Sequence, residues 1–217
     1  MRISVIIPVY NEQAAINGTI ARLNDCEIVV SDCTGSTLDV ISDSSVIKKV
    51  RAERGRGNQL NAGAKAATGE ILLFLHADTE LPESWVRDIT ENIKFCDAGA
   101  FSLGIDDGRF IFRIIERTAT LRTKLTKIPY GDQAIFVKRE IFDKTGGFAD
   151  FPIFEDFRLM QDIKKTGANI HILPQKVKTS ARRWQKEGIL YVTLRNWFIT
   201  ILYLCGVSPH KLKKLYR

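Results

Sequence analysis

Two acidic clusters carry the side chains of this 217-residue chain that could do chemistry. In the segment FLHADTELP, an apolar run ends in His76, Ala77 and Asp78. A histidine and a carboxylate two residues apart point to the same side of an extended chain. Mg²⁺ or Mn²⁺ usually takes one or two protein carboxylates and fills its shell with water and substrate phosphates. Asp78 is therefore a candidate metal ligand; the alternative is an aspartate that caps a turn.

The second cluster is FEDFRL, in which Glu155 and Asp156 follow an aromatic loop. A carboxylate held in a pocket can act as a general base that removes the proton of a hydroxyl group during attack. The alternative is structural, because acidic residues in the first turn of a helix are favoured by its dipole. Both interpretations stay open on the sequence alone.

A glycine-punctuated segment, RGRGNQLNAGAKAATG, covers residues 54–69. It lacks the dinucleotide-binding fingerprint, since Leu60 stands where the third glycine is required and the segment follows a third strand rather than a first. A nicotinamide-dinucleotide site is not expected. Arg54 and Arg56 are candidate phosphate contacts, with solvated arginines as the alternative.

The elements that must position these side chains alternate between strand and helix. Apolar runs predict strands over 3–9, 27–31, 46–50 and 71–75, and helical spacing predicts helices over 11–23, 37–43 and 57–68. This rhythm is typical of a three-layer α/β/α fold with a mostly parallel central sheet. Ligands of such sheets bind beyond the carboxyl ends of the strands. The polar residues of the first half all follow strand ends: Tyr10, Glu12, Asp32 and His76 to Asp78.

The second half is expected to add three strands and four helices to the same domain. The strands cover 98–105, 134–137 and 171–174, and the helices cover 84–95, 108–125, 139–145 and 155–165. Ser84 is a possible N-cap of the first of these helices. No linker divides the chain, so we expect one domain over 1–187, followed by an apolar and basic helical tail over 188–217.

Composition places the chain among soluble globular proteins and concentrates its positive charge at one end. Apolar residues make up 45% and charged residues 26% of the chain, and the net charge is +7. Residues 176–217 hold ten Lys or Arg against one acidic residue, a local charge of +9. The four cysteines show no CxxC spacing, the three histidines are scattered, and no secretory signal precedes the first strand. A cytoplasmic protein without a zinc finger is expected.

Taken together, these segments resemble the inverting glycosyltransferases of family 2, which have the GT-A nucleotide-diphospho-sugar transferase fold. The resemblance covers nearly the whole chain. The matching segments are VIIPVYNE, VVSDCTGSTLD, ERGRGNQLNAGAKAATGEILLFLHADT, GDQAIFVKREIFDKTGGF and FEDFRL. The segments TSARRW and GVSP are similar to a bacterial subgroup, the "transferase 2" proteins named for radical-SAM and selenodomain neighbours.

The resemblance implies a role for each candidate residue. It implies that Asp32 binds the nucleotide base, that Asp78 holds a divalent cation, Mn²⁺ or Mg²⁺, and that Asp156 is the general base with Glu155 beside it. The other residues that it places at the nucleotide-sugar donor are Pro8, Tyr10, Glu12, Arg54, Arg56, Asn61, His76 and Ala77. Near the sugar or the acceptor it places Gly131, Asp132 and Gln133. His76 replaces the usual first aspartate of the D-x-D motif; it either ligates Mn²⁺, which suits imidazole better than Mg²⁺ does, or hydrogen-bonds the sugar or phosphate.

The reaction that the resemblance implies is a single displacement with inversion, from a nucleotide-sugar donor, UDP-linked, to an acceptor that the sequence does not identify. Two alternatives remain. A sugar nucleotidyltransferase on the same fold usually has a glycine-rich loop after its first strand, where this chain has VYNEQAA. A non-catalytic nucleotide-sugar-binding module would not need both acidic clusters. Nucleic acid is not an expected partner, because no binding motif accompanies the basic tail.

The tail contains one long apolar segment, GILYVTLRNWFITILYLCGV, over residues 188–207. Arg195 and Asn196 near its middle make a transmembrane span costly. We therefore expect a helix that either packs on the domain or lies in a membrane interface. Basic flanks that extend to Arg217 suit an anionic lipid surface at the inner face of a membrane. A further basic series, Arg109, Arg113 and Arg117, is expected to face water; the alternative is that it extends this lipid-facing surface.

Overall fold

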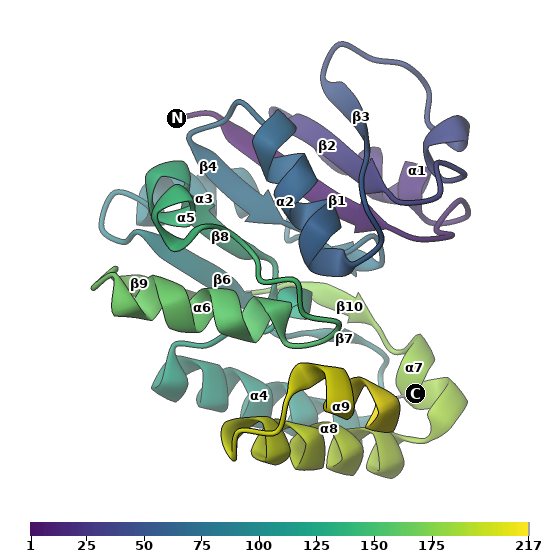
Figure 1. The fold of residues 1–217 in the computed structure, drawn as a ribbon, viewed down its shortest axis with the longest axis vertical. Helices are drawn as coiled ribbons and strands as arrows, with labels where there is room; N and C mark the ends of the chain where they lie inside the picture. Colours follow the sequence, from purple (N-terminus) through teal and green to yellow (C-terminus); the bar gives the residue numbers. More distant parts are fainter. Residues whose placement is uncertain (217) are drawn as a thin grey trace.

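A seven-stranded sheet forms the centre of the protein, for which the computed structural model describes residues 1–216 (Figure 1). Arg217, one of the cations of the basic tail, lies outside the described residues. In spatial order the strands are β3 (Ile47–Arg51), β2 (Glu27–Asp32), β1 (Ile3–Val9), β4 (Ile71–Phe74), β8 (Ile135–Lys138), β6 (Ala98–Ser102) and β9 (Ile170–Lys176).

The first four of these strands in the sheet are mutually parallel, as the continuous apolar runs of β1, β2 and β4 predict. Strands β2 and β4 are buried along their whole length, and β1 is buried except at Pro8. Strand β8 then enters the sheet antiparallel to both β4 and β6, while β9 pairs in parallel with β6. The carboxyl ends of β1, β2 and β4 therefore meet at one edge.

Helices cover both faces of the sheet, which confirms the three-layer α/β/α prediction. One apolar cluster joins a face of the sheet to α1 (Ile16–Ile20) and α3 (Trp85–Asn92). The other joins the opposite face to α2 (Arg56–Ala66), α5 (Arg139–Thr145) and α6 (Glu155–Lys165). Figure 1 shows α2, α5 and α6 on the near side of the strands. Helix α2 approaches the sheet closely at Gly63. A Cβ on this residue would lie 2.5 Å from Ile6 Cγ2, so the close approach requires glycine.

Several predicted elements are shorter than the sequence pattern suggested. The helix predicted over 11–23 is reduced to α1, because Asn11 has φ of 57° and the Glu12 N–H bonds Thr37 Oγ1. The helix predicted over 37–43 is a single 3₁₀ turn, η1 (Leu38–Val40). Ser84 is the N-cap residue of α3, as predicted, but its hydroxyl donates to Asp88 Oδ2 at 2.6 Å and accepts no backbone N–H of the helix.

A second, three-stranded sheet was not predicted, because its strands are only two or three residues long. It pairs β5 (Thr79–Glu80), β10 (Lys178–Ser180) and β7 (Ile105–Asp106). The strand predicted over 98–105 is therefore divided between the two sheets. Because β5 follows Asp78 directly and β10 leads to Arg182, this small sheet joins distant segments beside the strand edge.

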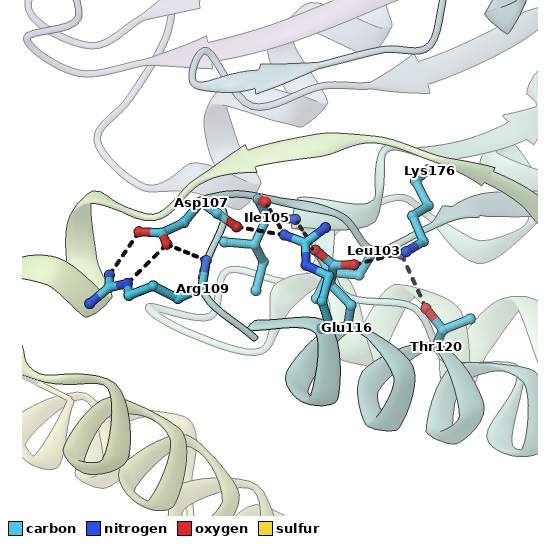
Figure 2. Close-up of polar contacts among 8 residues, drawn as sticks. Leu103, Ile105, Asp107, Arg109, Glu116, Thr120 and Lys176 are labelled. Carbon is cyan, nitrogen blue, oxygen red and sulfur yellow. Dashed lines mark hydrogen bonds and ion pairs between the residues drawn. The ribbon is translucent and has the colours of Figure 1, made fainter. Parts of the chain in front are cut away.

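Helix α4 (Phe110–Thr126) is held beside the small sheet by a buried carboxylate. Glu116 is 1% exposed, accepts the Ile105 N–H at 2.9 Å, and pairs with Arg113 and Lys176 at 2.8 Å each (Figure 2). Arg109, the residue before α4, forms an ion pair with Asp107. The expectation that Arg109, Arg113 and Arg117 all face water is thus wrong for Arg113, whose guanidinium is engaged by backbone carbonyls and Glu116.

Three helices end the described chain: α7 (Arg182–Glu187), α8 (Ile189–Leu204) and α9 (Pro209–Leu215). Helices α8 and α9 pack on the domain through a small apolar cluster that includes Ile153, Ile199 and Leu212, and α7 packs through Trp184, in the cluster of Phe112. Within the described residues, no helix combines the length and the apolar character that crossing a bilayer requires.

Candidate active site

Asp32 ends β2 and has a fully buried side chain at the strand edge. Its Oδ1 accepts hydrogen bonds from the Thr34 N–H and hydroxyl, and its Oδ2 accepts one from the Thr37 N–H at 2.9 Å. Burial alone would raise the pKa of Asp32, but these hydrogen bonds lower it below its usual value. Asp32 is therefore an ionised acceptor that also shapes its own loop.

Gln59 joins the carboxyl ends of β1 and β2 and was not predicted from the sequence. Its buried amide donates to the carbonyl oxygens of Val9 at 2.6 Å and Ser31 at 3.0 Å. Next to these strand ends, the guanidinium of Arg54 lies 5.5 Å from the ring centroid of Tyr10, which is 49% exposed. No local pattern marks Gln59, because its partners are 28 and 50 residues away in sequence.

Asp78 lies opposite a cation that was not predicted at the site. One guanidinium nitrogen of Arg182 is 4.0 Å from Asp78 Oδ2 and 4.0 Å from Glu12 Oε1. Burial raises the pKa of Glu12, Arg182 lowers it and Asp78 raises it, with a net increase. Arg182 was expected among the basic residues that flank the C-terminal apolar segment, whereas the fold places it between two carboxylates of the first half.

Asp156 lies at the start of α6 and is fixed by backbone donors. Its Oδ2 accepts the Gly131 N–H at 2.5 Å, and its Oδ1 accepts the Phe157 N–H at 2.6 Å. A side chain on Gly131 would not fit, because a Cβ there would lie 2.9 Å from His76 Nε2 and 3.3 Å from Asp156 Oδ2. The close approach of these three residues explains the glycine.

His76 lies with the acidic pair of α6. It lines a small cavity together with Arg56, Gly131, Glu155 and Asp156. Burial and the nearby charge of Arg56 lower the pKa of His76 to about 3, so its imidazole is neutral. A neutral imidazole can accept one hydrogen bond and donate another.

Glu155 is a buried partner of Arg56, with Oε1 3.0 Å from the Arg56 guanidinium and only 2% of the side chain exposed. Burial raises the pKa of Glu155, and Arg56 offsets part of that increase. Arg56 itself stays protonated, because Glu155 and Asp156 raise its pKa against the effect of burial. This ion pair joins the start of α2 to the start of α6, which lie 99 residues apart.

Asp132 links the two acidic clusters. It belongs to η2 (Gly131–Gln133), a 3₁₀ turn whose first N–H bonds Asp156. The pKa of Asp132 is raised to about 6, mainly by burial and also by the charges of Asp156 and Asp78, while Arg122 and Arg56 offset part of the increase. Asp78 and Asp156 therefore lie within electrostatic reach of one partly buried carboxylate, although they come from opposite halves of the chain.

Three of the residues that the resemblance assigned to ligands make hydrogen bonds within the protein itself. Asn61 uses both ends of its amide on the backbone of Phe148, at 2.8 and 2.9 Å. Gln133 is 1% exposed and bonds Thr123, the Tyr130 N–H and the Phe101 carbonyl. Ala77 is 6% exposed, and its carbonyl accepts the Thr19 hydroxyl at 2.6 Å. Pro8 is the next-to-last residue of β1 and pairs with Ser31, next to the Asp32 loop.

The side-chain oxygens around Asp78 can hold a hard cation only if phosphate or water oxygens complete its coordination shell. Among residues 1–216, no group of three or more His, Cys, Asp or Glu side chains is arranged to hold a metal ion. The side chain of Asp78 is 37% exposed, and Glu12 is nearby. One or two carboxylates with open positions match Mg²⁺ or Mn²⁺ bound together with a diphosphate.

Comparison with known proteins places the fold and the family. The model for "Glycosyl transferase family 2" matches residues 4–151. An uncharacterized glycosyltransferase of Nostoc sp. is 34% identical over 142 residues, which are 58% of this chain and 44% of the relative. The chain spans about half the length or less of the curated relatives that it matches.

Two solved structures illustrate the GT-A likeness. A mannosyltransferase from Pyrobaculum calidifontis, in complex with GDP-Man and Mn²⁺, has a TM-score of 0.71 at 22% identity. The match covers 89% of this chain and 59% of the mannosyltransferase chain. Glucosyl-3-phosphoglycerate synthase from Mycobacterium tuberculosis, with Mn²⁺, UDP and glucosyl-3-phosphoglycerate, has a TM-score of 0.63 at 19% identity. That match covers 95% of this chain and 81% of the synthase chain. The predicted GT-A fold is confirmed.

Proposed function

The chain belongs to glycosyltransferase family 2, and from this premise we propose that it transfers a sugar from a nucleotide-diphosphate donor to a hydroxyl group of an acceptor, with inversion at the anomeric carbon. The observation that carries the proposal is the pKa of Asp132, which both Asp78 and Asp156 raise. A diphosphate site and a proton acceptor on one crevice are what a glycosyl transfer requires.

The donor is proposed to bind along the edge of β1, β2 and β4. Asp32, ionised and placed beyond β2, would accept hydrogen bonds from the base, and Pro8, Tyr10 and Arg54 would line the nucleotide pocket. We infer a UDP-linked donor from the family resemblance. Two neighbours support the donor class, since one is bound to GDP-Man and the other to UDP.

Asp78 is the residue proposed to hold the divalent cation, with Glu12 beside it. A bound Mn²⁺ or Mg²⁺ would supply positive charge to the departing diphosphate. Arg182, 4.0 Å from both carboxylates, keeps their negative charge compensated and is placed to contact the same phosphates. The neutral His76 is proposed to hydrogen-bond the sugar or phosphate, the alternative that its position beside Gly131 supports.

Asp156 is the proposed general base. Its two oxygens each accept one backbone N–H and keep a further lone pair, so the carboxylate is oriented and still able to accept a proton. In the proposed step the acceptor oxygen bonds the anomeric carbon, the bond from that carbon to the diphosphate oxygen breaks, and the hydroxyl proton passes to Asp156. Arg56 compensates the adjacent buried Glu155. Gly131 and Asp132 would face the sugar or the acceptor.

A donor screen tests the proposal. UDP-, GDP- and dTDP-sugars are added with Mn²⁺, and thermal shift reports binding while release of the nucleoside diphosphate reports slow transfer to water. We expect one donor class to raise the melting temperature and to be hydrolysed, with hydrolysis lost in EDTA and restored by Mn²⁺. Formation of a nucleotide sugar and pyrophosphate from a sugar phosphate and a nucleoside triphosphate would instead identify a nucleotidyltransferase.

A further inference from the structure

Helix α8 turns an entirely apolar face away from the protein. Seven large side chains on it are each more than half exposed: Leu190, Tyr191, Leu194, Trp197, Phe198, Ile201 and Leu204. The opposite side of the helix carries Val192, Arg195 and Ile199, which are buried. A surface helix of a soluble domain normally has the reverse arrangement, with its apolar stripe toward the core.

Helix α4 carries a second apolar stripe, formed by Phe110, Ile111, Ile114, Leu121 and Leu125. These residues recur at helical spacing on the side opposite Phe112, Glu116 and Thr123, which are buried. Glu116 holds that inner side against β7 and β9 (Figure 2), so the stripe is fixed outward. Twelve of the eighteen exposed large apolar side chains in the described part of the chain lie on α4 and α8.

The two apolar faces belong to one surface, which we call the α4–α8 face. Ile115 and Ala119 of α4 pack in the same cluster as Ile189 of α8, and the Tyr130 hydroxyl, just after α4, lies 3.2 Å from Thr200 Oγ1 of α8. Figure 1 shows both helices at the same end of the molecule, away from β1–β3. On each helix the exposed side lies opposite the buried side, so both faces look away from the body of the protein.

The α4–α8 face is larger than an ordinary surface patch. A half-exposed large apolar side chain presents roughly 100 Å², so the seven residues of α8 alone expose about 700 Å². The largest apolar patch of a typical soluble monomer is roughly 300–600 Å² and is often functional. Arg195, the one charged residue of α8, points inward and pairs with Glu187 Oε2 at 2.5 Å, so no charge interrupts the face.

Positive charge surrounds the α4–α8 face. Arg117 and Lys124 are exposed beside the stripe of α4, Arg183 and Lys186 are exposed on α7, and Lys211 and Lys214 are exposed on α9. Glu187 is the only acidic residue of the three C-terminal helices, and it is paired with Arg183 and Arg195. An apolar centre within a basic surround complements the surface of a bilayer that contains anionic lipids.

We propose that the α4–α8 face docks on an anionic lipid bilayer, with its apolar side chains at the boundary between headgroups and acyl chains and its cations on the lipid headgroups. The sequence suggested membrane contact through the C-terminal tail, with the basic series Arg109, Arg113 and Arg117 as a possible extension; the structure adds the apolar stripe of α4. This proposal does not depend on the donor, the metal or the base, because none of the residues of the face lines the catalytic crevice.

Vesicle flotation with the purified full chain tests the proposal. Binding is measured with vesicles of phosphatidylcholine alone and with vesicles that contain 30% phosphatidylglycerol, at low and high salt. The variants are Trp197→Ser with Phe198→Ser on α8, and Leu121→Ser with Leu125→Ser on α4. Phe95→Ser is the matched control, because Phe95 is 82% exposed but follows α3. Melting temperature is measured for each variant, since exposed substitutions should leave the fold intact.

We expect the wild-type chain and Phe95→Ser to float with phosphatidylglycerol vesicles, at least tenfold more than with phosphatidylcholine alone and less at high salt. Each double variant should bind at least fivefold more weakly. Absence of wild-type binding, or equal binding by either double variant, would overturn the proposal. A dimer in solution that the α8 double variant dissociates, without vesicle binding, would assign the face to a second copy of the chain and overturn it as well.

Discussion

Replacing Asp132 by Asn should stabilise the protein at neutral pH, although it removes a residue of the proposed acceptor region. The pKa of Asp132 is raised from 3.8 to about 6 in the folded chain. A carboxyl whose pKa is higher in the folded than in the unfolded state stabilises the fold only while protonated. Its ionisation therefore lowers the free energy of unfolding as the pH rises from about 3.8 to about 6, and the loss is complete above that range.

The size of the effect follows from the pKa. At roughly 1.4 kcal/mol for each pKa unit, the rise from 3.8 to about 6 corresponds to about 3 kcal/mol. Asn resembles the protonated carboxyl and does not ionise, so Asp132→Asn should gain up to about 3 kcal/mol at pH 7.5 and close to nothing at pH 3.5. Carboxylates held against electrostatic cost are common at functional sites, where stability and activity conflict.

Urea unfolding at a series of pH values measures this difference. EDTA should be present throughout, because a bound cation near Asp78 would lower the pKa of Asp132. Asp97→Asn is the control of opposite sign: hydrogen bonds from Lys138 and the Asn169 N–H lower the pKa of Asp97, so its loss should destabilise the protein at pH 7.5. A free energy of unfolding unchanged by Asp132→Asn at pH 7.5, or changed equally at both pH values, would refute the electrostatic argument.

Three further predictions concern the crevice. Asp156→Asn should lower transfer at least about 100-fold while donor affinity, measured by calorimetry, stays within about twofold; an equal loss of both would show a structural role. Gly131→Ala should place a Cβ 2.9 Å from His76 Nε2 and displace the Asp156 contact, so turnover should fall about tenfold or more at an unchanged melting temperature; full turnover would contradict the geometry. Arg182→Gln removes a cation 4.0 Å from both Asp78 and Glu12, so donor-free Mn²⁺ affinity should rise a few-fold, a small effect because Arg182 is 70% exposed; weaker Mn²⁺ binding would mean that Arg182 orients Asp78.

Uninterrupted apolar runs made three central strands predictable from the sequence. Strands β1, β2 and β4 are buried on both faces, so their residues follow the simplest pattern that a parallel sheet imposes. The helix α6 was predicted with its correct bounds, because Glu155 and Asp156 open it and a regular apolar stripe follows. These signals are local, and each lies within one element.

The parts that the sequence did not predict depend on contacts between distant segments. Arg182 reaches the site because β10 pairs with β5 next to Asp78, and strands of two or three residues leave no pattern. The pairing of His76 with Asp78 was expected from the alternation of an extended chain, but β4 ends at Phe74, so that alternation does not reach either residue. Asn61 and Gln133 were assigned to ligands by resemblance, whereas their amides bond the backbone of Phe148 and of Phe101.

The buried charge of α8 determines which side of that helix meets the surroundings. Rotating α8 about its axis would hide its apolar residues but would pull Arg195 away from Glu187 and from the ring of Tyr216. The orientation of α8 is thus specified by the contacts of its buried arginine. Substitutions among Leu194, Trp197 and Ile201 are consequently free to adjust adhesion over evolutionary time, strengthening or weakening it stepwise, while the rest of the architecture remains as it is.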